Sequence, residues 1–124
     1  MSVQKPLTKG DIILVSNDPK PHHNREQKGL RPWLILSEQA LNEVSPFVWA
    51  VPFTTTDRSY PLVYEWLAAE RGTQTYGTLL CDQLTTLDVV HRYYSFLEHT
   101  DVPIEVDQLV NHRILYQRRL CHLH

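Results

Sequence analysis

Cysteine, glycine and long apolar runs are all scarce in this chain of 124 residues. The two cysteines, Cys81 and Cys121, are too few for a disulfide framework or a four-thiolate zinc site. No run approaches the roughly 18 apolar residues of a membrane-spanning helix, and the first residues lack the apolar core of a secretory signal. We therefore expect no membrane segment and no secretion. The expected location is the cytoplasm, where thiols stay reduced.

A strong excess of charge of one sign is also missing. The chain has 14 acidic and 12 basic residues, so its formal net charge is -2. This excludes a globally basic nucleic-acid-binding protein but allows a local basic patch. Hydrophobic residues make up 42% and charged residues 21% of the chain, which is typical of a globular protein rather than a disordered one. The length predicts a single domain over residues 1–124, large enough to bury its own core.

Short apolar runs predict a mainly β fold. These runs are rich in Val, Ile, Leu and aromatic residues, and turn residues separate them. The predicted strands cover residues 11–16, 33–37, 47–53, 62–66, 78–81 and 93–97. Because Pro52 cannot donate to a sheet ladder, we expect the end of the third strand to leave the ladder or to lie at an edge.

Two segments have the pattern of helices. Residues 37–42 predict a single turn capped by Ser37. A stronger pattern follows Pro103, where either Thr100 or Asp101 offers an N-cap. Four apolar residues there recur at the spacing of one helical face: Val106, Leu109, Val110 and Ile114. The predicted class is therefore a small, strongly curved β-sheet or barrel with one C-terminal helix.

The segment 20–31 concentrates positive charge between two predicted strands. It contains four Lys or Arg residues, one Glu and two His. Such a loop can attract phosphate groups, although a solvated loop without a ligand explains the same composition. Arg31 differs from the other cations because it directly precedes Pro32 at the start of an apolar run. It could form a structural ion pair, or it could present a fixed guanidinium group to a phosphate.

Polar residues follow two other predicted strands. Thr54 comes after the run that ends at Phe53, and Asp82 and Gln83 come after the run that ends at Cys81. Either position is equally typical of a turn residue that bonds its own backbone. The seven histidines do not have the spacing of a known metal motif, so we expect no metal site.

Several short motifs, taken in their order, resemble the MazF/PemK toxin family. They are GDI at 10–12, EQKGLRP at 26–32, LILS at 34–37, VPFTT at 51–55 and GTLLCDQ at 77–83. The likeness runs from about residue 9 to residue 92. It implies an SH3-like β-barrel with flanking helices that forms a homodimer. It also implies a sequence-selective endoribonuclease, the toxin of a type II toxin–antitoxin pair. The partner would be a small antitoxin whose disordered C-terminal segment blocks the RNA site.

The resemblance also implies roles for individual residues. Arg31 is similar to the catalytic arginine of the family, and Thr54 matches the threonine that holds the scissile phosphate. Asp82 matches an aspartate that acts as acid or base in the PemK-like branch, but Leu80 stands where that branch has an arginine. The residues that we expect to contact RNA are Arg25, Glu26, Gln27, Lys28, Thr55 and Gln83.

The implied chemistry agrees with these residue types. RNA carries its own nucleophile, the 2′-hydroxyl, so an enzyme has to align it, move protons and stabilise a negatively charged phosphorane. A fixed arginine and a threonine hydroxyl suit this task, and no metal or cofactor is expected. Single-stranded RNA would be cut to a 2′,3′-cyclic phosphate and a 5′-hydroxyl, whereas DNA lacks the nucleophile.

Two other functions stay open from the sequence. One is a CcdB-like toxin that binds DNA gyrase, but such proteins use a C-terminal tip that the ending RRLCHLH does not match. The other is a non-catalytic SH3-like binding module, which would not need Arg31, Thr54 and Asp82 together.

Overall fold

A computed structural model describes residues 6–16, 30–56 and 60–112 of the chain. Seven strands and three helices make up these residues, and every strand pairing is antiparallel. The strands are β1 (Asp11–Ser16), β2 (Leu30–Ile35), β3 (Phe47–Thr54), β4 (Val63–Trp66), β5 (Gly77–Leu80), β6 (Thr85–Asp88) and β7 (Tyr94–His99). The helices are α1 (Gln39–Val44), α2 (Ala68–Arg71) and a last helix over residues 104–112.

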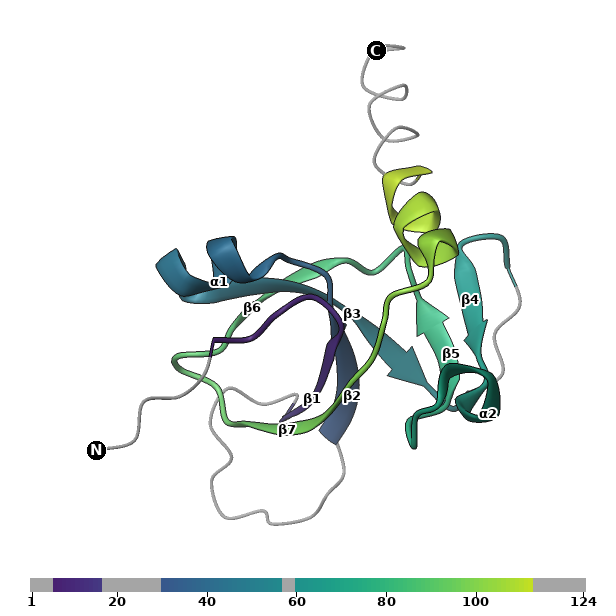
Figure 1. Ribbon diagram of the computed structural model, residues 1–124, viewed down its shortest axis with the longest axis horizontal. Helices are drawn as coiled ribbons and strands as arrows, with labels where there is room; N and C mark the ends of the chain where they lie inside the picture. The colour runs from purple at the N-terminus through teal and green to yellow at the C-terminus, as the bar shows by residue number, and fades with distance from the viewer. Residues whose placement is uncertain (1–5, 17–29, 57–59, 113–124) are drawn as a thin grey trace.

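Strand β3 connects the two parts of the sheet. Its first half pairs with β6, its last two residues pair with β5, and its other edge pairs with β2. The sheet order is β4-β5-β3-β2-β1-β7, with β6 paired beside β3. Figure 1 shows β1, β2, β6 and β7 curling around one centre with the start of β3, while β4, β5 and α2 lie to the other side. The mainly β fold with a C-terminal helix is confirmed, although the strand pairs of the described residues do not close into a ring.

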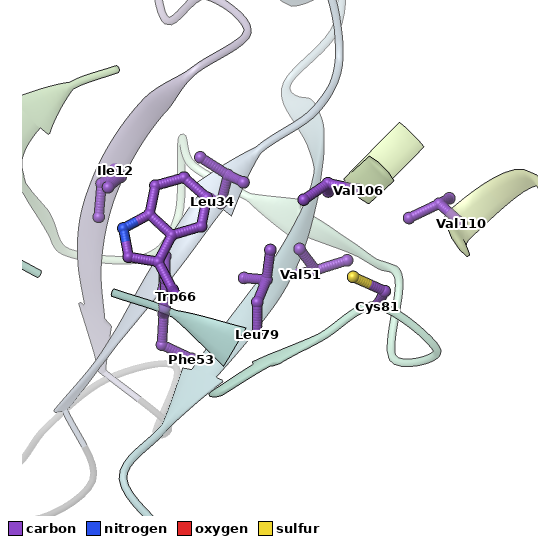
Figure 2. Packing of buried hydrophobic residues seen from close by; sticks show 9 residues of the cluster. All are labelled: Ile12, Leu34, Val51, Phe53, Trp66, Leu79, Cys81, Val106 and Val110. Atoms are coloured by element: carbon purple, nitrogen blue, oxygen red, sulfur yellow. The ribbon is translucent and has the colours of Figure 1, made fainter. Parts of the chain in front are cut away.

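Two apolar clusters form the core, one on each face of the β1–β2–β3 sheet. The cluster inside the curl contains Leu7, Ile13, Val15, Ile35, Val48, Ala50 and Leu87. The other cluster, shown in Figure 2, lies between this sheet, β4–β5 and the last helix; it contains Ile12, Leu34, Val51, Phe53, Trp66, Leu79, Cys81, Val106 and Val110. Because β1 supplies both clusters, it is buried on both faces, which explains its unbroken apolar run.

The last helix packs its apolar face onto the second cluster. Val106 and Val110 are buried there, as the helical spacing predicted. The predicted N-cap is wrong, because the helix begins at residue 104 and the Thr100 hydroxyl donates to the carbonyl of Asp101 instead. Ile114 lies outside the described residues.

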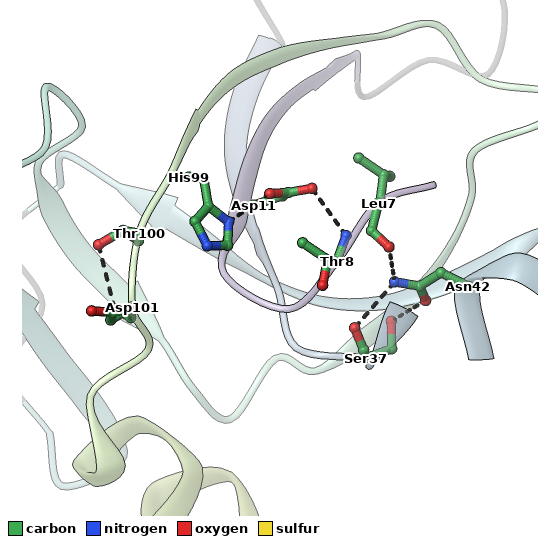
Figure 3. A network of polar contacts seen from close by, with 8 residues as sticks. All are labelled: Leu7, Thr8, Asp11, Ser37, Asn42, His99, Thr100 and Asp101. Carbon is green, nitrogen blue, oxygen red and sulfur yellow. Dashed lines mark hydrogen bonds and ion pairs between the residues drawn. The ribbon is translucent and has the colours of Figure 1, made fainter. Parts of the chain in front are cut away.

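Ser37 is not a helix cap either. Helix α1 begins two residues later, and its cap position has no side-chain hydrogen bond. The Ser37 hydroxyl instead donates to Asn42 Oδ1 at 2.6 Å and accepts the N–H of Trp49 at 3.0 Å. Asn42 in turn donates to the carbonyl of Leu7 at 2.7 Å. Figure 3 shows how these contacts attach α1 to the segment before β1.

The expectation that the strand leaves a ladder at Pro52 or lies at an edge is confirmed in its first part, because the ladder with β2 ends at the pair of Pro52 with Trp33. Pro52 is buried in β3, which has neighbours on both sides, and it pairs with Trp33 of β2. Along the edge of β3 opposite β2, β6 pairs with residues 47–50 and β5 pairs with residues 53 and 54. Pro52 lies between these two partners, where a missing N–H removes no ladder hydrogen bond.

Two short elements were absent from the sequence prediction, namely β6 and α2. Each has four residues, and β6 buries only Leu87 while α2 buries none. Such elements are too short and too exposed to show the repeating spacing of apolar residues that identifies a helix or a strand. Within the described ranges, no helix is long and apolar enough to cross a membrane.

Candidate active site

Arg31 extends from the second residue of β2. Its partner across the ladder is Val15 of β1, which belongs to the cluster inside the curl. The Arg31 side chain is half-buried, and it makes no hydrogen bond or ion pair within the described part of the chain. The sequence left open whether Arg31 forms a structural ion pair. No carboxylate of residues 6–16, 30–56 or 60–112 forms an ion pair with Arg31.

The register of β2 and β3 relates Arg31 to Thr54. The paired residues are Trp33 with Pro52, Leu34 with Val51, and Ile35 with Ala50. Carried two residues further, the same register places Arg31 opposite Thr54, although the ladder itself stops at Trp33. Because residues two apart along a strand share a face, both side chains lie on the face of Trp33 and Pro52. Arg31 near the start of β2 and Thr54 at the end of β3 therefore share a face of the sheet, both beyond the last paired residues of the β2–β3 ladder.

The Thr54 hydroxyl has one local partner. Its Oγ1 accepts the backbone N–H of Thr56 at 3.1 Å, which is the turn contact that the sequence alone could not exclude. This contact uses a lone pair and leaves the hydroxyl proton free to donate. Thr55 and Thr56 are exposed beyond it. The turn therefore fixes the Thr54 side chain without removing its capacity to donate to a phosphate oxygen.

A groove of about 620 Å³ opens beside Thr54 and Thr55. Trp66, Tyr76 and Thr78 belong to its lining, together with Gly77, Glu65 and residues 67–70. Tyr76 is largely exposed, whereas Trp66 is a core residue with 1% exposure. The groove offers an aromatic surface and hydroxyl groups next to Thr54.

Asp82 lies away from this groove. β5 pairs Thr78 with Thr54, and Asp82 lies in the turn that follows the last residue of β5, Leu80. Its Oδ1 accepts the hydroxyl of Tyr60 at 2.9 Å. Gln83 is exposed in the turn that follows. The structure thus puts Arg31 and Thr54 on one face of the sheet, and it puts Asp82 and Gln83 beyond the far end of β5, so a catalytic role for Asp82 stays a prediction.

Four of the predicted RNA contacts are not covered by the described ranges. Arg25, Glu26, Gln27 and Lys28 fall in residues 17–29, so their roles also stay predictions. Among the described residues, no three His, Cys, Asp or Glu side chains gather in a group that could hold a metal ion.

Comparison with known proteins gives the family. A sequence profile described as "PemK-like, MazF-like toxin of type II toxin-antitoxin system" matches residues 8–116. The chain belongs to this family. The PemK/MazF likeness extends to a curated relative, the endoribonuclease PemK of Escherichia coli, at 34% identity over 87 residues. That match covers 69% of this chain and 64% of the relative, so the chain spans just under two thirds of that protein's length.

Two solved structures share the fold. MazF from Deinococcus radiodurans is 27% identical, with a TM-score of 0.67 over 89% of this chain and 94% of that one. A mycobacterial endoribonuclease in complex with its cognate antitoxin is 21% identical, with a TM-score of 0.66 over 87% of this chain and 94% of that one. These likenesses confirm the mainly β fold with its C-terminal helix.

The sequence pointed to Arg31 and Thr54 but gave no reason to select Gly77 or Glu98. Both residues contact the loop or strand beside Thr54. A glycine directly before an apolar run was a usable signal for Gly77. Glu98 had none, because its position depends on a strand irregularity that the sequence does not display.

Proposed function

We propose that this PemK/MazF family member is the toxin of a type II toxin–antitoxin pair and acts as a metal-independent, sequence-selective endoribonuclease on single-stranded RNA. The observation that supports this most directly is the half-buried Arg31, which has no partner among the described residues and shares a face with Thr54. The likeness to the E. coli endoribonuclease PemK supports the choice of substrate.

In the proposed reaction, the 2′-hydroxyl of one nucleotide attacks the adjacent phosphorus atom. The bond to the 5′-oxygen breaks, leaving a 2′,3′-cyclic phosphate and a 5′-hydroxyl end. Negative charge grows on the non-bridging oxygens as the phosphorane forms, and a fixed guanidinium group stabilises that charge. We assign this role to Arg31 and the donation of a hydrogen bond to a phosphate oxygen to Thr54.

The residue that transfers protons in this reaction is supported by fewer observations. An arginine is almost always protonated, so Arg31 is a poor general base at neutral pH. Asp82 is the proposed acid or base, but it lies at the other end of β5 from Thr54 in the same chain. Its assignment therefore rests on the family motif alone, and the pH–rate profile of Asp82→Asn tests it.

The remaining proposed contacts concern RNA recognition and partners. We assign RNA binding to the cationic segment with Arg25, Glu26, Gln27 and Lys28, and to Thr55 and Gln83. A disordered, acidic antitoxin segment would compete for the same positive charge. A homodimer would cover exposed aromatic residues such as Trp49, whereas Trp66 is buried in the core and could not contribute. Action on messenger RNA would occur in the cytoplasm.

The test is direct incubation of the purified protein with a long RNA of mixed sequence in the presence of a chelator. The proposal expects cleavage at a limited set of sequences, with 2′,3′-cyclic phosphate ends, and no cleavage of DNA of the same sequence. The Arg31→Ala protein, purified in the same way, controls for contaminating ribonucleases. Intact RNA, or cleavage that requires an added divalent metal, would contradict the proposed mechanism.

A further inference from the structure

Glu98 near the end of β7 holds the loop between α2 and β5. Its carboxylate accepts the backbone N–H of Gln74 at 3.0 Å and the backbone N–H of Thr75 at 2.8 Å. It also accepts the Thr75 hydroxyl at 2.6 Å. These contacts join residues 23 or 24 positions apart in the chain. A single carboxylate therefore fixes the path of two consecutive backbone amides.

A bulge in β7 gives Glu98 this orientation. β1 pairs Ile13 with Phe96 but Ile12 with Glu98, so Leu97 is an extra residue in the ladder. Without the extra residue, the register would place Leu97 opposite Ile12, and Glu98 would face Asp11. A shift of one residue turns a side chain to the other face of a sheet. The bulge thus turns Glu98 toward β5, and it brings His99 opposite Asp11.

The His99–Asp11 contact stabilises the same register. His99 Nδ1 lies 2.8 Å from Asp11 Oδ1, and the other Asp11 oxygen accepts the N–H of Thr8 at 2.9 Å. Asp11 is buried, and Figure 3 shows its carboxylate between these two partners. In the regular register, Asp11 would meet the Glu98 carboxylate, and two like charges would repel. The bulge and the direction of Glu98 are therefore fixed together.

The loop that Glu98 holds leads directly to the candidate active site. Thr75 is followed by Tyr76 and Gly77, and the Gly77 backbone lies against the carbonyl group of Thr54. The next residue, Thr78, pairs with Thr54 in the β3–β5 ladder. On its other side, the loop is held by the Trp66 indole N–H, which donates to the Thr73 hydroxyl at 3.0 Å. Only Tyr76 separates the residue that Glu98 binds from the residue that touches Thr54.

We propose that Glu98 is a positioning residue for RNA cleavage, because its grip on the backbone of Gln74 and Thr75 places Gly77 and thereby the phosphate-binding hydroxyl of Thr54. The inference rests on the proposed endoribonuclease function and extends it to a residue outside the site. In this proposal Glu98 acts through residues 75–77 and not through a contact with RNA. A misplacement of catalytic groups by about 1 Å can lower a rate on the order of a hundredfold.

The contacts of Glu98 with Gln74 and Thr75 require an ionised carboxylate within hydrogen-bond distance of these donors. Three donors converge on the two oxygens of Glu98, and a carboxylate can accept all of them. In Glu98→Gln, the amide NH₂ group would face a backbone N–H, and one donor would lose its partner. In Glu98→Asp, the carboxylate stays but is one methylene shorter. The aspartate variant should therefore retain more of the wild-type rate than the glutamine variant.

Asp88 supplies a matched control. Its Oδ1 accepts two consecutive backbone N–H groups, those of Val90 and His91, at 3.0 and 3.1 Å. Asp88 pairs with Phe47 at the start of β3, seven residues from Thr54 and about 23 Å away along the strand. Asp88→Asn thus removes an equivalent carboxylate clamp far from the site.

The experiment measures steady-state cleavage of one RNA substrate by the wild-type protein, Glu98→Gln, Glu98→Asp and Asp88→Asn. We expect Glu98→Gln to lower kcat by about ten- to a hundredfold with little change in KM, because Thr54 acts mainly in the transition state. Asp88→Asn should keep kcat close to the wild-type value. Equal losses in Glu98→Gln and Asp88→Asn, or a change in KM alone, would overturn the inference.

A double-mutant cycle separates positioning from general destabilisation. If Glu98 acts through Thr54, then Glu98→Gln should cost little additional rate in a Thr54→Ala protein. Fully additive losses would overturn the inference, and melting temperatures of all variants identify any protein that fails to fold.

A wild-type protein that cleaves no RNA would instead contradict the proposed function. The role of Glu98 is then decided by the amide resonance of Thr54, which Glu98→Gln should shift and Asp88→Asn should not. A Thr54 resonance that both variants leave unchanged would overturn the inference.

Discussion

Gly77 packs so closely against Thr54 that no side chain fits between them. A Cβ atom on Gly77 would lie 2.6 Å from the Thr54 carbonyl oxygen, and the φ of Gly77 is +129°. Residues other than glycine rarely adopt this conformation. The start of β5 and the end of β3 therefore meet backbone to backbone, and this contact places the Thr54 side chain at the edge of the groove.

The first prediction compares two glycines with positive φ. Gly72 has a φ of +69°, and a Cβ atom added to it would meet no atom of the described residues within 4 Å. Gly72→Ala should therefore cost only the roughly 1–2 kcal/mol of a left-handed residue. Gly77→Ala carries similar strain and also forces the Thr54 carbonyl away. We expect it to lower the free energy of unfolding further and to lower the cleavage rate, which Gly72→Ala should not. Urea unfolding and cleavage assays check both, and equal effects would contradict the role of Gly77.

The second prediction concerns Arg31. Arg31→Ala should lower the single-turnover cleavage rate by about 10²–10³-fold, the typical cost of losing one preorganised donor at a developing charge. Arg31→Lys should recover little, because a point charge does not reproduce the planar fork of a guanidinium group. Since Arg31 has no ion-pair partner in the described ranges, thermal stability should change little in either variant.

Thr54→Ala is the companion to this measurement. It removes one neutral donor to a charged group, which is worth about 1.5–3 kcal/mol, so its rate loss should be smaller than that of Arg31→Ala. An Arg31→Ala protein with full activity would rule out charge stabilisation by this residue.

The third prediction separates two roles for Asp82. Because Asp82 binds the Tyr60 hydroxyl at the end of β5 remote from Thr54, we expect it to act as an anchor within this chain. Asp82→Asn and Tyr60→Phe should then lower the rate modestly and to a similar degree, with the pH–rate profile unchanged. A large loss with an altered profile in Asp82→Asn alone would instead identify Asp82 as a catalytic acid or base.

The sequence predicted the strands that bury apolar residues on one or both faces. β1 was predicted with its correct bounds, and β3 was predicted to within one residue of its end. β2 begins three residues earlier than predicted, because Leu30, Arg31 and Pro32 pair with β1 although they are not a run of apolar residues. Pairing with a neighbouring strand can override weak local preference, and only the three-dimensional register reveals it.

The site could be predicted only in part, because the positions of its residues also depend on how the strands pair. Arg31 and Thr54 belong to motifs that a family likeness can identify, yet their common face follows from the β2–β3 register. Glu98 depends on an extra residue in β7, and a bulge of one residue leaves no pattern in a sequence of mixed apolar and polar residues. The separation of Asp82 from Thr54 likewise becomes visible only once β5 is paired.

The fourth prediction concerns the thiol of Cys81, which is buried in the second cluster. Burial is the main cause that raises the pKa of Cys81 to about 12, and the negative charges of Asp82 and Asp107 add to it. Because the thiolate is the reactive form, Cys81 should resist iodoacetamide at pH 8 in the folded protein and react after unfolding in guanidinium chloride. Peptide mass spectrometry reports the labelling of this cysteine separately. Rapid labelling of Cys81 in the folded protein would contradict its placement in the core.

The last prediction uses the pKa of Glu98 to test its contacts without any activity assay. Burial alone would raise this pKa, but hydrogen bonds from the Thr75 hydroxyl and from the N–H groups of Gln74 and Thr75 outweigh it and hold the pKa below the ordinary value of 4.5. The unfolded chain therefore binds this proton more tightly than the folded protein does. The stabilisation by Glu98 is complete above the unfolded pKa and is lost as the pH falls through the folded pKa. Glu98→Gln has no such titration, so the wild-type protein should exceed it in free energy of unfolding at pH 7, and the difference should shrink below about pH 4.5. Urea unfolding of both proteins at equal concentration between pH 7 and pH 3 measures this difference, and a difference that stays constant over that range would show that the Glu98 carboxylate does not make these contacts.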